Sequence, residues 1–256
     1  MRSEVEARWL DYAWEVVNCP ERHRAACVRS GGAAPGPGRV DGNELRWPAY
    51  LGPGYRERRG VLCVGAVHRE STPEGEKADP RIVRTNRQLA ESAREWLAVG
   101  RSEDADDRYL DRLRTAYAEA LPAWSRWQRH FRTLVEDYLQ MDQAQIAWTN
   151  LAKCRVSIDR GAKQRAAEVQ LTRLCQQTFP VADLVEAIRP RVVLVAVLGA
   201  VKPGEIVSSW SSPSCSPLVY AWQGQSGHDR HNTAPGARPL SEWAPEMANS
   251  VRAAFD

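Results

Sequence analysis

The sequence predicts an α/β protein, a three-layer α/β/α sandwich around a central, mostly parallel sheet of four strands. Two observations predict this class. Compact apolar runs alternate with stretches of helical spacing along the chain, and the run "VVLVAVLG" is apolar throughout, which indicates a strand buried on both faces. With 256 residues, the chain is long enough to bury a large core, so we expect a single domain over residues 1–256.

The expected strands are short apolar runs bounded by glycine or by polar residues. They are "GVLCVG", Ile146 to Thr149, "RVVLVAVLG" and "SPLVYAWQG". The second of these runs stops at Thr149-Asn150 and continues into a loop that contains a lysine, a cysteine and an arginine. Because parallel sheets bind ligands beyond the carboxyl ends of their strands, we expect the functional residues at that edge.

Helices are expected between the strands, where apolar side chains recur at helical spacing. They cover Val5 to Val17, Asn86 to Leu97, Tyr109 to Leu139 with an interruption near Pro122, Lys163 to Ile188 with a break at Pro180, and Pro245 to Phe255. The acidic segment "SEDADD" is interpreted as a break between two of them. Residues from about 105 to 140 form a helical insertion.

Composition excludes some classes of protein and leaves others open. The net charge of +3, from 35 basic and 32 acidic residues, is too small to indicate a nucleic-acid-binding protein by itself. The longest apolar run is too short to cross a bilayer, so we expect a cytoplasmic protein without a membrane partner. For the oligomeric state, a monomer is the default expectation. Six cysteines in so long a chain favour free thiols or metal ligands over a disulfide framework.

The order of four segments resembles the uracil-DNA glycosylase superfamily. These segments are "VLCVGAVHRE", "AWTNLAKCR", "CQQTFPVADLVEAIRPRVVLVAVLG" and "VYAWQGQSGHDRH". The resemblance covers about residues 60–100 and 145–235 and does not account for the helical insertion. It implies a DNA glycosylase that hydrolyses the N-glycosidic bond of a uracil-like or damaged base flipped into a pocket. DNA or another ligand containing a nucleobase would be the partner.

The resemblance assigns base recognition to Asn150, with Gly65 beside the base. An amide suits this task, since its oxygen accepts from a ring N–H while its NH2 donates to the adjacent carbonyl. The alternative is that Asn150 only caps the loop that follows the strand. Contacts to nucleic acid are expected from Lys153, Arg155 and Arg230.

The catalytic segments depart from the family pattern. After Gly65, where the family has an acidic residue and then an aromatic one, this chain has Ala66-Val67, followed by His68 and Glu70. The histidine of the family's last motif aligns with Gln223, which could donate to the base oxygen that gains charge as the bond breaks.

His228 or His231 could take the same role, because Gly224 and Gly227 leave their loop pliable. We therefore expect Gln223, His228, His68 and Glu70 to supply the catalytic groups. The alternative for each histidine is an exposed loop residue. Ala66-Val67 also favours a second function, a non-catalytic member of the superfamily that binds a nucleobase, a nucleotide or nucleic acid.

The cysteines allow an iron–sulfur cluster. One class within the superfamily holds a 4Fe–4S cluster on four cysteines, and Cys19, Cys27, Cys154 and Cys175 occur at the corresponding places in this chain. The interval between Cys19 and Cys27 is longer than the family's Cys-x-x-Cys pair. Buried thiols that act as small hydrophobic residues are the alternative.

Overall fold

The structure is a computed structural model. It describes residues 2–19, 48–65, 68–69, 80–123, 127–151, 153, 155–156, 172–173, 175–197, 210, 215–224, 231–232 and 240–255. The helical segments are α1 (Glu4–Val17), α4 (Pro80–Val99), α5 (Glu103–Ala120), η1 (Leu121–Ala123), η2 (Trp127–Tyr138), η3 (Gln143–Gln145), α7 (Val181–Ile188) and α9 (Leu240–Phe255). The strands are β1 (Tyr50–Leu51), β2 (Val61–Gly65), β3 (His68–Arg69), β4 (Ile146–Asn150), β5 (Arg155–Val156), β6 (Val192–Val197), β7 (Leu218–Gly224) and β8 (His231–Asn232).

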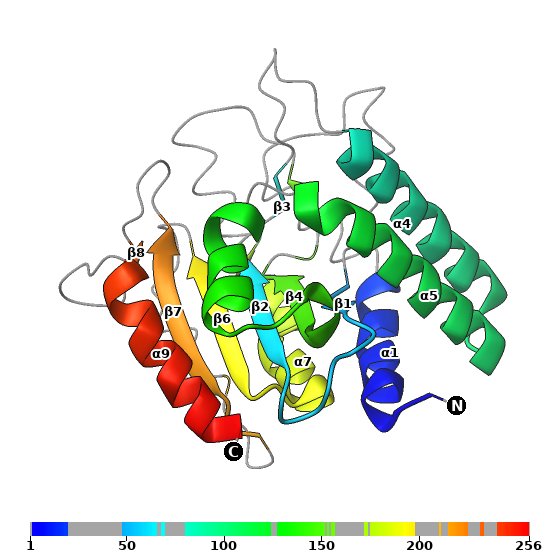
Figure 1. Cartoon of the computed structure of the whole chain (residues 1–256). Helices are drawn as coiled ribbons and strands as arrows, with labels where there is room; N and C mark the ends of the chain where they lie inside the picture. Colours follow the sequence, from blue (N-terminus) through cyan, green and yellow to red (C-terminus); the bar gives the residue numbers. More distant parts are fainter. Residues whose placement is uncertain are drawn as a thin grey trace.

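The main sheet is mixed and mostly parallel, with the strand order β1-β4-β2-β6-β7-β8 (Figure 1). The four central strands are parallel and coincide with the four apolar runs of the sequence, which confirms the α/β class. The prediction of four strands was too low, because β1 and β8 pair antiparallel at the two edges of the sheet. Two-residue strands of this kind carry no periodic pattern that a sequence could reveal.

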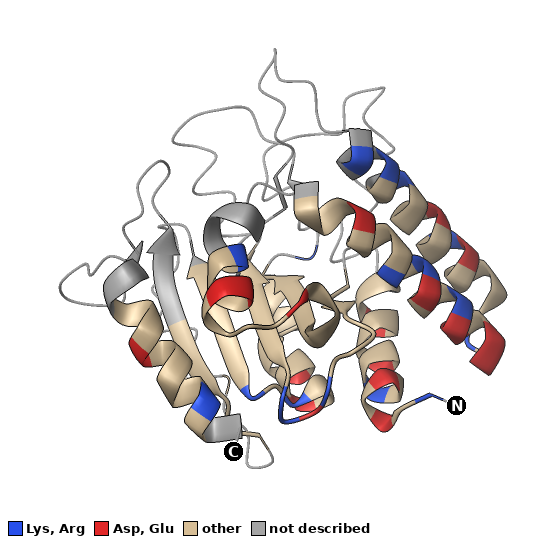
Figure 2. Ribbon diagram, in the orientation of Figure 1, with Lys and Arg blue, Asp and Glu red and all other residues tan. Residues whose placement is uncertain are grey.

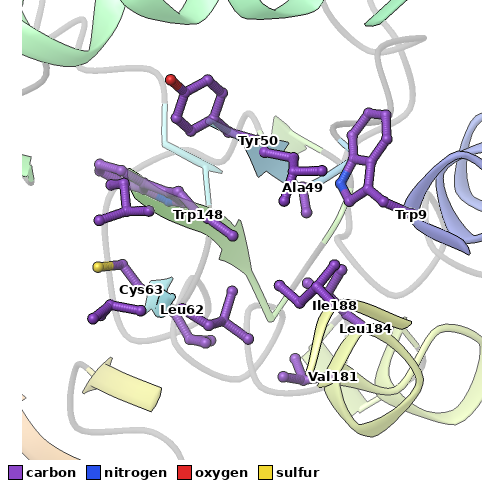
Figure 3. Packing of buried hydrophobic residues seen from close by; sticks show 14 of the residues in the cluster. Trp9, Ala49, Tyr50, Leu62, Cys63, Trp148, Val181, Leu184 and Ile188 are labelled. Carbon is purple, nitrogen blue, oxygen red and sulfur yellow. The ribbon is translucent and has the colours of Figure 1, made fainter. Parts of the chain in front are cut away.

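Successive residues of β4 show that both faces of the sheet are covered. Trp148 lies 5.4 Å from Phe131 of η2 between ring centroids, so this face packs against η2. Thr149 points to the opposite face, because side chains alternate along a strand. On that face, α1 and α7 pack against each other, and Trp9 of α1 belongs to the same buried cluster as Leu184 of α7 (Figure 3).

Three helix boundaries differ from those expected. α4 begins at Pro80 rather than near Asn86, with proline in the first turn, where a missing N–H costs little. The acidic segment predicted to be a break is the first turn of α5, since Ser102 caps it and its acids suit the positive end of the helix dipole. α9 begins at Leu240 and contains Pro245, which was expected to be its first residue.

The α4–α5 hairpin is fastened to α1 by aromatic and charged side chains. Trp96 stacks on Tyr109 with ring centroids 4.0 Å apart and meets Trp14 of α1 edge-on at 4.9 Å. The buried Asp106 accepts a hydrogen bond from the Trp96 indole N–H at 2.9 Å. Among the described residues, no helix has the length and apolar character needed to cross a bilayer.

Candidate functional site

Asn150 and Gly65 lie side by side at the carboxyl edge of the sheet. They are the last residues of the neighbouring parallel strands β4 and β2, and they pair in register. The Asn150 side chain is buried, with 3% of the residue exposed. A Cβ atom added to Gly65 would overlap the Asn150 Oδ1. The amide therefore lies against the backbone of Gly65 in space that only glycine leaves open.

The segments that follow β2 and β4 stay together beyond the main sheet. β3 and β5 form a separate parallel pair in which His68 is the partner of Arg155 and Arg69 is the partner of Val156. The structure thus brings the backbones of two predicted site residues, His68 and Arg155, next to each other. This pair continues the β2–β4 neighbourhood past Gly65 and Asn150, so both chain segments leave the sheet at the same place.

Gln223 lies at the same edge of the sheet but three strands away from Asn150. It pairs with Val197 of β6 and with Asn232 of β8. β2 and β6 lie between β4 and β7, so strand spacing separates the two backbone positions by roughly 14 Å.

Other predicted site residues lie outside the described residues. They are Glu70, His228 and Arg230, together with the proposed cluster ligands Cys27 and Cys154. Of the four residues expected to converge, His68, Glu70, Gln223 and His228, the structure describes only the backbones of His68 and Gln223, so their convergence stays a prediction.

Lys153 was expected to contact nucleic acid, but its side chain is directed into the protein interior. Only 1% of the residue is exposed, and the ammonium lies 5.7 Å from the centre of the Tyr12 ring of α1. Burial lowers the pKa of this lysine to about 7, an effect that Cys175 partly opposes. A phosphate contact requires an exposed cation. In this arrangement the Lys153 ammonium is therefore not placed to contact a phosphate.

Two of the four cysteines proposed as cluster ligands are described, and both are buried. Cys19 lies just after the end of α1. Burial raises the pKa of Tyr12 in the same helix, and Asp183 and Cys175 raise it further, so Cys175 lies near α1 as well. No group of three or more metal-binding side chains occurs within the described part of the chain.

Three arginines of α4 form a surface that the sequence did not lead us to expect. Arg81, Arg84 and Arg87 are exposed and recur every three residues, and no acidic residue occurs in α4 before Glu91. Arg84 and Arg87 form no ion pair with a described residue. We call these three residues the arginine stripe. Figure 2 shows basic positions at the start of α4. The three-residue spacing of the arginines in "RIVRTNR" was the sequence signal that could have revealed the arginine stripe.

Hydrogen bonds place the arginine stripe at the carboxyl edge of the sheet. The Tyr117 hydroxyl donates to the Pro48 carbonyl at 3.2 Å, and the Thr85 hydroxyl donates to the Ala116 carbonyl at 3.1 Å. Pro48 precedes β1, whose antiparallel pairing with β4 puts it level with Asn150. The start of α4 is thus linked through the end of α5 to the strand end that carries Asn150 (Figure 1).

Comparisons of the chain with protein-family models, with curated proteins and with solved structures give no match.

Proposed function

We propose that this protein is a DNA glycosylase-like hydrolase that binds a uracil-like or damaged base flipped out of DNA. The observation that carries the proposal is the buried Asn150 amide, held against Gly65 where two neighbouring parallel strands end. An amide at that position offers one acceptor and one donor to the edge of a base, which distinguishes uracil from cytosine. The narrow space beside Gly65 limits the orientations that the amide can adopt.

The chemistry requires a donor at the base and a water molecule at the sugar. As the N-glycosidic bond breaks, its electron pair goes to the base, and a hydrogen bond to the base oxygen stabilises the developing charge. Gln223 is the proposed donor, because β7 ends at the same sheet edge as β4. His68, Glu70 and His228 belong to segments that follow β2 or β7, and we assign to them the alternative donor and the orientation of water.

Two structural features form part of the proposal. One is a three-layer α/β/α arrangement, supported by Phe131 against Trp148 on one face and by Tyr12 near Lys153 on the other. The second is a 4Fe–4S cluster on Cys19, Cys27, Cys154 and Cys175, which would hold the segments around α1 and the β4 loop together. Iron and sulfide analysis of anaerobically purified protein tests the cluster separately from any activity.

The glycosylase proposal predicts a selective enzyme. We expect weak or undetectable release of uracil from ordinary duplex DNA, because Val67 stands where an ionisable side chain would position water. Release should be faster from single strands or mismatches, where flipping costs less. The measurement compares oligonucleotides that contain uracil, hypoxanthine, xanthine or an alkylated base, in single- and double-stranded form, and scores abasic sites.

Rapid release of uracil from every duplex would contradict our interpretation of the loop after β2. Inactivity on all substrates, combined with measurable binding of nucleotide or DNA, would replace the enzyme by the non-catalytic alternative. Release of one other base would keep the glycosylase assignment and identify its substrate.

The arginine stripe predicts where the DNA backbone is bound. Changing Arg84 and Arg87 together to glutamine should weaken binding of a single-stranded oligonucleotide by about tenfold at low salt. The slope of log K against log salt should also become shallower, by roughly 0.7 for each phosphate of the single strand that is no longer neutralised. Fluorescence anisotropy over a range of salt concentrations measures both quantities.

A charge-matched control lies at the opposite edge of the sheet. Arg56 and Arg59 are exposed in the turn before β2 and form no ion pair with a described residue. Changing both to glutamine alters the net charge by the same amount. Equal losses of affinity in the two double variants would show that DNA binding depends only on the total charge of the protein. The arginine stripe would then no longer be assigned as the site that binds the DNA backbone.

A further inference from the structure

Lys153 binds the last two residues of β4 from within the protein interior. Its ammonium donates to the Thr149 Oγ1 at 2.6 Å and to the Asn150 carbonyl oxygen at 2.8 Å. No described carboxylate forms an ion pair with it. A buried lysine without an acidic partner is costly, because the ammonium loses its hydration.

Gln176 binds the next carbonyl along the same chain segment. Its Nε2 donates to the Leu151 carbonyl oxygen at 2.7 Å, and its Oε1 accepts from the backbone N–H of Val181, the first residue of α7. The Leu151 N–H in turn donates to the Gly65 carbonyl oxygen at 2.8 Å. The segment that follows β4 is thus connected to β2 on one side and to the start of α7 on the other.

We propose that Lys153 and Gln176 are positioning residues that hold the backbone of Asn150 and Leu151, and thereby fix the Asn150 amide for base recognition. We call this pair the β4 clamp. The inference rests on the proposed function for the role of Asn150, but the clamp itself consists of described contacts. Neither residue touches the base; each acts through the backbone that carries the Asn150 side chain.

The geometry explains why a backbone clamp would matter at this position. The Asn150 side chain lies in the space left by the missing Cβ of Gly65, so a small rotation of its backbone would move the amide out of that space. A misplacement of about 1 Å in a site can lower activity by about a hundredfold. Recognition groups need support from surrounding hydrogen bonds for the same reason.

The first test needs no ligand. Amide hydrogen exchange is measured for Leu151, whose N–H is bound to Gly65, in wild type and in the variants Lys153→Met and Gln176→Met. We expect each variant to accelerate exchange at Leu151 by about tenfold, while exchange at Cys63 and Trp148 in the same strands stays unchanged. Acceleration throughout β2 and β4 would indicate general destabilisation and would overturn the clamp.

A matched control removes another buried hydrogen bond from a side chain to a backbone carbonyl. The Thr85 hydroxyl donates to the Ala116 carbonyl within the α4–α5 hairpin, and Thr85→Val removes this bond while keeping the shape of the side chain. This variant should leave the exchange of Leu151 unchanged. If it accelerates Leu151 as much as the clamp variants do, the effect is not local and the proposal fails.

The second test asks whether the clamp acts through Asn150. Binding of single-stranded oligonucleotides with and without one uracil is compared in wild type, Lys153→Met, Asn150→Ala and the double variant. We expect Lys153→Met to reduce the preference for uracil by about tenfold in the wild-type background and to have no further effect once Asn150 is truncated. If the effects of Lys153→Met and Asn150→Ala on uracil preference are additive in the double variant, Lys153 does not act through Asn150 and the inference is overturned.

The two tests separate failure of the clamp from failure of the proposed function. If Leu151 exchange responds as expected but no base preference exists in wild type, the proposed function fails and the clamp remains as a local device. If base preference exists and depends on Asn150, while the clamp variants change neither exchange nor preference, the inference is wrong. Gln176→Met keeps both tests available if Lys153→Met does not fold.

Discussion

Changing Asn150 to alanine is expected to reduce the discrimination between the preferred base and its competitors by about a hundredfold, because the pocket loses a donor and an acceptor together. The free energy of unfolding should change by about 1 kcal/mol or less, since the substitution removes a polar amide rather than core hydrocarbon. The measurement compares release or binding across the oligonucleotide set and follows unfolding in urea.

Gly65→Ala provides a second route to the same effect. The new Cβ would overlap the Asn150 Oδ1, so the amide must move away from its position. Discrimination should fall as it does in Asn150→Ala, although Asn150 is still present. In the Asn150→Ala background, Gly65→Ala should have little further effect, because the clash is gone. Full discrimination in either single variant would contradict the assignment of base recognition to this pair.

Changing Asp106 to alanine is expected to lower the free energy of unfolding by about 3 kcal/mol. Asp106 is 3% exposed, and its carboxylate accepts from the Trp96 indole, from Arg101 at 2.9 Å and from Arg2 at 3.3 Å. Alanine leaves the buried indole N–H without an acceptor and removes the charge that both arginines share. Urea denaturation followed by circular dichroism measures the loss.

The neighbouring Asp107 is the matched control. It also pairs with Arg2, at 2.8 Å, but 52% of its side chain is exposed. Solvent screens such a pair, so Asp107→Ala should cost about 1 kcal/mol or less. Asp106→Asn keeps one oxygen acceptor for Trp96 and should fall between the two. Similar losses for Asp106→Ala and Asp107→Ala would show that burial does not determine the strength of this junction.

Several predictions of function stay predictions. They include the single domain over residues 1–256, the monomeric and cytoplasmic state, and the glycosylase activity. The same applies to the partner, the 4Fe–4S cluster and the roles of Glu70, His228 and Arg230. Oligonucleotide assays and iron and sulfide analysis address the site and its ligand directly.

The amino-acid sequence by itself determined the four central strands and the edge at which they end. Their apolar runs are continuous because both faces are covered, and a continuous run is a local property that needs no knowledge of the fold. The same holds for Asn150, whose place at the end of such a run could be predicted. The helix boundaries were predicted less well, because the acids after Ser102 suit either a break or a first helical turn.

Only the tertiary structure decided what surrounds these residues. Lys153 stands in a polar, cationic segment and was expected at the surface. Its burial depends on Tyr12, which lies far away in sequence and packs over it, and on two acceptors at the end of β4. Gln176 reaches Leu151 only because the helical residues before α7 pack beside β4. Contacts between distant segments leave no periodic or compositional trace in either one, so only their three-dimensional arrangement reveals them.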